Sequence, residues 1–230
     1  KDCAWRWERF GRPGEIYNST TEKKNEDRHM MGKTHVAVGV LVALLVFQPI
    51  TIAACAATIA GGALGGSAAD IDAIKTDHNH DALLGQLIPV GITGSMLLVE
   101  HFLGESITSS LQDPNRVAMV AGAAFYFVLL AKGYASGHRT FTHSILTAVL
   151  FTVAIYLVWP MAAPGYFAGY LSHLLLDSLN RKDIRLFYPL KKGISLKLCY
   201  ADGKAYSVLC WVGTTGSVVM TALLMLKVFG

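Results

Sequence analysis

Residues 145–159 read ILTAVLFTVAIYLVW, and residues 117–131 read VAMVAGAAFYFVLLA. Neither stretch contains a charged residue, and neither shows the polar face at helical spacing that a surface helix of a soluble protein carries. A helix that crosses the hydrocarbon core of a bilayer needs about 20 largely apolar residues. The two stretches therefore favour helices in lipid over helices in a soluble core.

The rest of the chain extends this pattern, because 53% of the 230 residues are hydrophobic and only 16% are charged. Soluble domains carry about 25% charged residues. We predict an all-α fold, a polytopic transmembrane helical bundle with about seven membrane segments, some of them short or re-entrant. The predicted segments are 34–48, 50–67, 86–103, 117–133, 143–159, 164–180 and 206–229.

The first 30 residues differ in composition from the remainder. Lys1–His29 is polar, has charges of both signs and lacks the apolar core of a signal peptide. A natural start at Met30 or Met31 would leave residues 1–30 as a disordered or non-native N-terminal extension. We expect residues 31–230 to form a single transmembrane domain.

The distribution of Lys and Arg predicts the orientation. If the segments cross the membrane alternately, the loops 68–85, 133–142 and 181–205 lie on one side and carry nearly all the basic loop residues, whereas the opposite loops contain only Arg116. Short loops rich in Lys and Arg stay in the cytoplasm. The pattern predicts a multi-pass membrane protein with these loops in the cytoplasm, and it explains the net charge of +4 without a nucleic-acid partner.

Ionisable side chains gather at the predicted cytoplasmic end of the segments. Such residues are costly at a membrane edge, and their default interpretation is functional. His173 and Asp177 are four residues apart, so they share one face of a helix. We predict a metal site, facing the cytoplasm, that is formed by His35, Asp70, Asp72, His138, His143, His173 and Asp177.

The ligand types restrict the metal. Imidazoles and carboxylates without thiolates suit Zn²⁺, Mn²⁺ or Fe²⁺, so we expect one or two divalent ions, with Zn²⁺ first. We expect Asp70-Ile71-Asp72 in a loop, where two carboxylates can bind one ion or bridge two. Singly, each residue also has a structural interpretation: Asp70 could end a helix, and Asp177 could pair with Arg181.

Three residues are predicted to take part in chemistry. Arg139 lies between two of the predicted ligands in sequence and is a candidate to neutralise an anionic substrate, with ordinary membrane anchoring as the alternative. Asp72 or Asp177 could accept a proton as general base. Hydroxyl groups near the ligands could bond to them or to their own backbone, namely those of Thr142, Ser144 and Ser172.

The motifs Thr34-His35, Asp70-Ile71-Asp72, His138-Arg139-Thr140-Phe141-Thr142-His143-Ser144 and the stretch GYLSHLLLD at 169–177 occur together. In this combination, residues 31–200 resemble the family of LexA-regulated, inner-membrane-bound proteins that are assigned as metal-dependent hydrolases. The resemblance implies a bacterial or archaeal protein of the inner (plasma) membrane in which the seven His and Asp residues are the metal ligands. The chain departs from the family at Ala69, where a Pro is common, and at Ala73, where a His is common, so His78 or His80 could fill the latter role.

The leading functional prediction is therefore a membrane-embedded metal-dependent hydrolase that acts at the cytoplasmic leaflet. Its expected substrate is a phosphoester or a lipid-linked anionic ester, taken either from a membrane lipid or from a small anionic molecule. Two alternatives stay open. The same residues could transport protons or divalent cations, or they could bind a metal that only stabilises a membrane scaffold.

Overall fold

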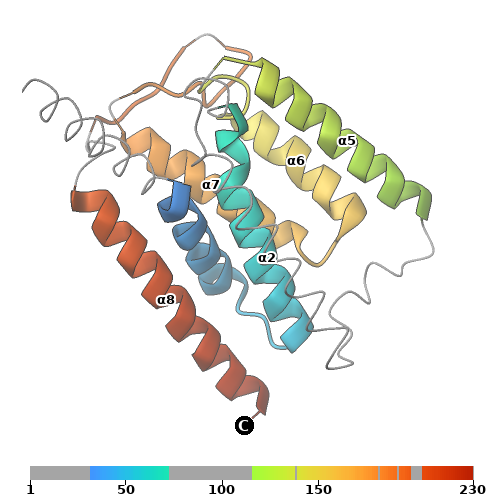
Figure 1. Cartoon of the computed structure of the whole chain (residues 1–230), viewed down its shortest axis with the longest axis vertical. Helices are drawn as coiled ribbons and strands as arrows, with labels where there is room; N and C mark the ends of the chain where they lie inside the picture. Colours follow the sequence, from blue (N-terminus) through green and yellow to red (C-terminus); the bar gives the residue numbers. More distant parts are fainter. Residues whose placement is uncertain are drawn as a thin grey trace, which may run out of the picture.

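The protein is described by a computed structural model over residues 32–72, 116–137, 139–180, 182–190, 192–197 and 204–229. This part of the chain is all-α, as predicted, and its extended pairing is limited to one isolated bridge between Ile184 and Ile194. The elements are helix Gly32–Phe47, α2 (Ile52–Ala68), the 3-10 helix η2 (Ala69–Asp72), α5 (Arg116–Ala135), α6 (Ile145–Val158), α7 (Ala163–Leu179) and α8 (Lys204–Phe229) (Figure 1).

The predicted segments agree with these helices to within two residues at each end, except segment 86–103, which lies outside the described residues. One local expectation was wrong. Asp70-Ile71-Asp72 is not in a loop but in η2, which continues α2 directly because a 3-10 turn often closes an α-helix. His143 lies just before α6: the next residue, Ser144, is the N-cap of α6 and accepts a hydrogen bond from the backbone N–H of Thr147 at 3.2 Å.

Helix α2 packs against both helix Gly32–Phe47 and α7, and its glycines allow both neighbours to approach closely (Figure 1). A Cβ atom on Gly66 would lie 2.6 Å from the carbonyl oxygen of His35, and one on Gly39 would lie 2.6 Å from that of Gly62. Small residues have this role at helix interfaces in membranes. The glycine-rich sequence of α2 therefore fixes the distance between the helices that carry the site.

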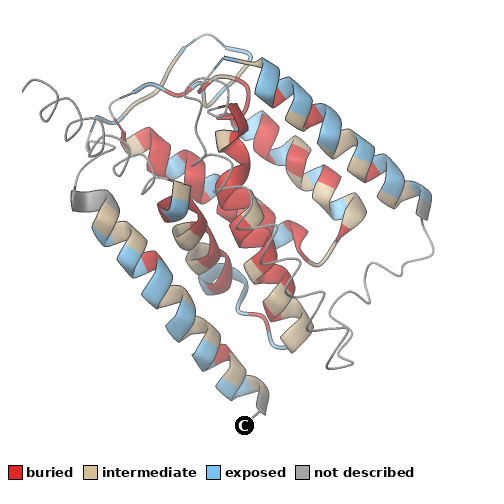
Figure 2. Cartoon of the chain, in the orientation of Figure 1, coloured by how far each residue is buried: buried red, intermediate tan, exposed pale blue. Residues whose placement is uncertain are grey.

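Helices α5 and α8 form the outside of the described bundle and direct large apolar side chains outward (Figure 2). Phe127 on α5 is 68% exposed, and Trp211 and Leu226 on α8 are 72% and 69% exposed. Within the described ranges, three stretches are long and apolar enough to cross a membrane, namely Ile52–Asp72, Val117–Ala135 and Ser207–Val228. Exposed apolar surface on this scale is stable when lipid is the solvent.

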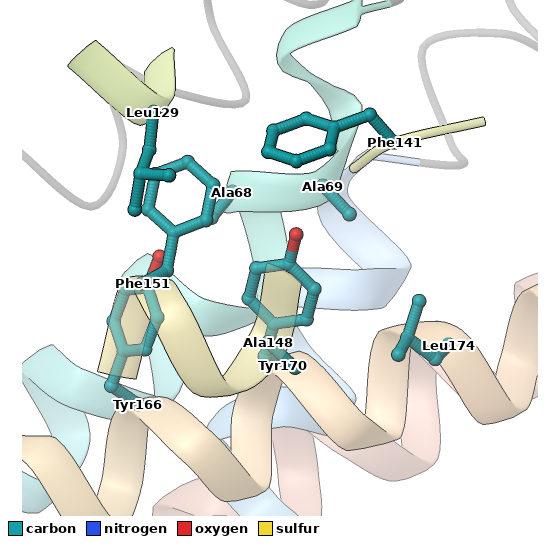
Figure 3. Packing of buried hydrophobic residues seen from close by; sticks show 9 residues of the cluster. All are labelled: Ala68, Ala69, Leu129, Phe141, Ala148, Phe151, Tyr166, Tyr170 and Leu174. Atoms are coloured by element: carbon teal, nitrogen blue, oxygen red, sulfur yellow. The ribbon is translucent and has the colours of Figure 1, made fainter. Parts of the chain in front are cut away.

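A buried hydrophobic cluster that includes aromatic rings supports the turn that precedes α6 (Figure 3). Phe141 and Tyr170 belong to this cluster, and the hydroxyl of Tyr170 donates a hydrogen bond to the carbonyl oxygen of Thr142 at 2.5 Å. The ring of Tyr188 packs edge-on against Phe141 with 5.7 Å between centroids. Packing and a hydrogen bond therefore hold the backbone immediately before His143.

Candidate metal centre

The structure brings together every predicted site residue that it describes; His138 lies outside the described residues. The side chains come from ends of different elements. His35 follows the start of helix Gly32–Phe47, Asp70 and Asp72 lie in η2, His143 precedes α6, and His173 and Asp177 lie in the last two turns of α7. Neighbouring helices run in opposite directions, so starts and ends of successive helices meet at one end of the bundle.

His143 and Asp177 form the closest pair of the cluster. Nε2 of His143 lies 3.1 Å from Oδ2 of Asp177 and 4.0 Å from Oδ1 of Asp70. Oδ1 of Asp177 also lies 3.6 Å from Nε2 of His35. One carboxylate therefore faces imidazoles from two other segments.

His173 is held in one orientation by the backbone of α2. Its Nδ1 lies 2.8 Å from the carbonyl oxygen of Gly66, which can only accept, so Nδ1 carries the proton and donates. Its Nε2 has no hydrogen-bond partner among the described residues and lies 3.6 Å from Oδ1 of Asp70. The ring stacks on that of His35 with 4.0 Å between centroids. A buried Nε2 with a free lone pair, next to a carboxylate, is the arrangement expected of a metal ligand.

Among the described residues, two groups of donor atoms are compact enough to hold an ion. One consists of His143, His173 and Asp177, the other of His35, Asp70 and His173, and within each group the donor atoms lie within 4.8 Å of one another. Zinc bonds to nitrogen and oxygen are about 2.0–2.2 Å, which places tetrahedral ligands roughly 3.4 Å apart. Small side-chain movements would therefore bring either group to coordination distances.

Burial and charge also fit a cation. The side chains of His143 and His173 are fully buried, and that of Asp177 is 6% exposed, whereas that of Asp70 is 24% exposed and marks the accessible edge. Counted over the described side chains alone and with neutral imidazoles, the three carboxylates and the guanidinium of Arg139 sum to two negative charges. A divalent cation would balance them and offset the cost of burying the carboxylates.

Asp72 lies on the Nδ1 side of the His143 ring, away from Asp177. Its Oδ2 accepts the backbone N–H of Arg139 at 2.9 Å and the hydroxyl of Thr142 at 2.7 Å, and it lies 3.4 Å from Nδ1 of His143. It therefore approaches the imidazole at the nitrogen opposite Nε2. The sequence predicts Asp72 as a ligand and a base, whereas this geometry favours a role in orienting His143.

Arg139 connects the site to the chain beyond α7. One terminal nitrogen of its guanidinium donates to the carbonyl oxygen of Lys182 at 3.2 Å, and the other lies 3.6 Å from Oδ2 of Asp177. Its backbone has φ = 60°, a left-handed conformation that is costly for a residue with a side chain. Its Nε has no hydrogen-bond partner among the described residues, so a buried N–H donor remains for an anionic group.

Of the three hydroxyl side chains near the site, one contacts site residues and two bond to the backbone. Thr142 contacts Asp72 and lies 3.1 Å from Nδ1 of His143, so it belongs to the site. Ser144 and Ser172 donate to the backbone carbonyls of Phe141 and Gly169 instead. Sequence reasoning missed the carbonyl oxygen of Gly66, because every residue has one and residue type does not reveal which carbonyl meets a His ring.

The bundle and the site together define the class: a helical membrane protein with a buried cluster of His and Asp residues at one end of its helices. Within this class, the chain belongs to the YdjM inner membrane protein family, which it matches over residues 30–229. It is also similar to the uncharacterized protein YvsG of Bacillus subtilis (strain 168), at 33% identity over 93 residues. That match covers 39% of this chain and 58% of the relative. No solved structure matches the chain significantly.

Proposed function

We propose that this protein is a metal-dependent hydrolase that passes the inner membrane several times and carries its site on the cytoplasmic side. The observation that carries the proposal is the buried group His143, His173 and Asp177, whose donor atoms lie within 4.8 Å of one another. Three ionisable side chains from two segments are costly to bury together unless a cation joins them. The resemblance to LexA-regulated hydrolases supports the same function and suggests LexA control of expression.

The proposed ligands are His35, Asp70, His143, His173 and Asp177, with Zn²⁺ as the first candidate and Mn²⁺ or Fe²⁺ as the others. Both donor groups use His173, whose only available nitrogen is Nε2 because Nδ1 donates to Gly66. One nitrogen binds one ion, so the described residues suit a single metal. A second ion would need ligands from outside the described residues.

A divalent cation at such a site supplies hydroxide near neutral pH by lowering the pKa of a coordinated water to about 7. The protein's own groups would determine where a proton released in the site goes. Asp72 already accepts two hydrogen bonds and is buried, whereas Asp70 is partly exposed at the edge of the site. Asp70 is therefore better placed than Asp72 to accept a proton and pass it to solvent, and Asp177 is the alternative.

The proposed substrate is a phosphoester or a lipid-linked anionic ester. The buried guanidinium of Arg139 lies beside the cluster and keeps one N–H without a hydrogen-bond partner among the described residues. A phosphoryl oxygen would satisfy that donor and share the charge that develops during hydrolysis. The site lies at the helix ends, within reach of lipid headgroups as well as of small anions from the cytoplasm.

The test combines metal analysis with a substrate panel. Protein purified in detergent without added metal is analysed by elemental mass spectrometry, and the wild type is expected to contain about one divalent ion per chain, which His173→Ala lacks. Wild-type protein is then assayed against phospholipids and soluble phosphoesters, with His173→Ala as the inactive control. A wild type without metal, or a His173→Ala protein that keeps its full metal content, would overturn the proposal.

The two alternatives give different results in the same experiments. A transporter usually holds its cargo near the middle of the bilayer, whereas this cluster lies at the ends of the helices. Uptake of metal into proteoliposomes that His173→Ala abolishes, without hydrolysis, would favour transport. Unfolding on chelation, with neither uptake nor hydrolysis, would favour a metal-stabilised scaffold.

A further inference from the structure

The segment that follows α7 is basic, apolar and ordered at the same time. We define the basic loop as the described residues 182–190 and 192–197. Its cationic side chains are exposed, and Asp183 is its single acidic residue. Three large apolar side chains are also exposed: Phe187 at 54%, Leu190 at 64% and Leu196 at 55%. The exposed cations are Lys182, Arg185, Lys192 and Lys197.

Hydrogen bonds hold the basic loop in its conformation. Ile184 is fully buried and exchanges two backbone hydrogen bonds with Ile194, at 3.0 and 2.9 Å. The backbone N–H of Leu196 donates to the carbonyl oxygen of Ser178 in α7 at 2.8 Å. The exposed apolar groups are therefore displayed by a fixed backbone, although a loop in water would gain by burying them.

The basic loop is also attached to the site. The backbone N–H of Arg185 donates to the carbonyl oxygen of Arg139 at 3.3 Å, and that of Ile145 donates to the carbonyl oxygen of Leu186 at 3.0 Å. The loop crosses the end of the bundle at which the His and Asp residues meet (Figure 1). In sequence, the loop lies between α7 and α8, and α8 contains the stretch Ser207–Val228, which is long and apolar enough to cross a membrane.

We propose that the basic loop is a docking surface for the anionic lipid headgroups of the leaflet on its side. Cationic side chains match the negative surface of such a leaflet. Phe187, Leu190 and Leu196 would enter the boundary between headgroups and acyl chains, as apolar side chains of interfacial segments do. A soluble anion would use the cations alone, so the apolar side chains select lipid as the occupant. This inference goes beyond hydrolysis, because the surface would bind lipid even in a metal-free protein.

The test measures lipid binding to the full chain in detergent by native mass spectrometry, with phosphatidylglycerol and phosphatidylcholine titrated separately. Each basic residue near an anionic surface contributes about 1 kcal/mol, which corresponds to ~5-fold in affinity. We expect the wild type to bind phosphatidylglycerol more tightly than phosphatidylcholine. In the double variant Arg185→Gln/Lys192→Gln, the ratio of the two affinities should fall by at least about 5-fold. Lys227→Gln, which removes an exposed cation near the end of α8, is the matched control and should keep it.

A second variant tests the apolar half of the surface. Phe187→Ser/Leu190→Ser leaves every charge in place and is expected to weaken the binding of both lipids. Metal content and the thermal midpoint of each variant, compared with the wild type, separate loss of lipid binding from loss of folding or of the metal site. Equal affinity of the wild type for the two lipids, or unchanged preference in Arg185→Gln/Lys192→Gln, would overturn the proposal. Unchanged lipid binding in Phe187→Ser/Leu190→Ser would reduce the surface to a site for soluble anions and would overturn it equally.

Discussion

Nδ1 of His173 lies 2.8 Å from the carbonyl oxygen of Gly66, although the two residues are 107 positions apart in the chain. The hydrogen bond fixes the tautomer of the imidazole and turns Nε2 toward Asp70. Gly66 also lies against the backbone of His35, where a Cβ would not fit. One glycine thus adjoins two of the proposed ligands, on helix Gly32–Phe47 and on α7.

Gly66→Ala should therefore disturb both the packing and the site. Its Cβ would lie 2.6 Å from the carbonyl oxygen of His35 and 3.2 Å from Cα of Val36, both backbone atoms. We expect a loss of about 1–3 kcal/mol in stability from overpacking, together with a lower metal content. Thermal unfolding in detergent measures the first effect. The control is Gly32→Ala, whose Cβ meets nothing within 4 Å, and equal midpoints for the two variants would contradict the prediction.

Asp72→Asn tests whether Asp72 orients His143 rather than binding the metal itself. An amide keeps the shape of the carboxylate, but it cannot stabilise His143 as an anion does. Loss of such an orienting group weakens metal binding by about 10–100-fold, whereas loss of a ligand in His173→Ala should abolish it. Competition with a fluorescent chelator gives the two affinities. Asp183→Asn, at an exposed carboxylate of the basic loop, is the control and should match the wild type.

Two variants, Arg139→Gly and Arg139→Ala, separate the backbone strain at this position from the role of the guanidinium. A left-handed conformation costs a residue with a Cβ about 1–2 kcal/mol, and glycine is free of this cost. Because Arg139 has φ = 60°, Arg139→Gly should be more stable than Arg139→Ala by about 1 kcal/mol. Both variants lose the guanidinium and should hydrolyse substrate equally poorly. Chemical unfolding supplies the comparison, and an Arg139→Ala protein at least as stable as Arg139→Gly would show that the backbone is not strained.

Tyr170→Phe removes a buried hydrogen bond that supports the turn before α6. The carbonyl oxygen of Thr142 would lose the donor that now lies at 2.5 Å, and an unsatisfied buried acceptor costs about 1–3 kcal/mol. We expect a lower thermal midpoint and, because Thr142 adjoins His143, weaker metal binding. Tyr156→Phe is the matched control, since Tyr156 on α6 is 59% exposed. If the two substitutions had the same small effect, the Tyr170 hydroxyl would be dispensable.

Metal removal should destabilise the wild type because it leaves buried carboxylates without a balancing charge. Chelation is expected to lower the midpoint of thermal unfolding in the wild type and to leave that of His173→Ala unchanged, since that variant holds no metal to lose. Adding Zn²⁺ back should restore only the wild-type midpoint. A chelator that shifts both proteins equally would point to an effect on the detergent or on the bundle, unrelated to this site.

Much of the fold could be predicted from the sequence because the decisive property is local. An apolar run such as Val117–Ala131 is compatible with a helix in lipid whatever its neighbours are, and the ends of the described helices lie within two residues of the predicted ones. His35, His143 and His173 lie near the ends of predicted membrane segments. Because successive segments cross in opposite directions, the sequence also predicted that these three residues share one end of the bundle. That inference needs only the direction of each helix, not its packing.

The tertiary structure alone decided how the groups at that end divide their roles. Hydrogen-bond partners depend on distances between helices, and here the glycines of α2 set those distances. For that reason the sequence could not show that Asp72 stands behind His143, that a backbone carbonyl orients His173, or that Arg139 ties the site to the basic loop. Apolar patterning specifies that a helix enters the membrane, whereas only the packing of one helix on the next specifies which atoms meet.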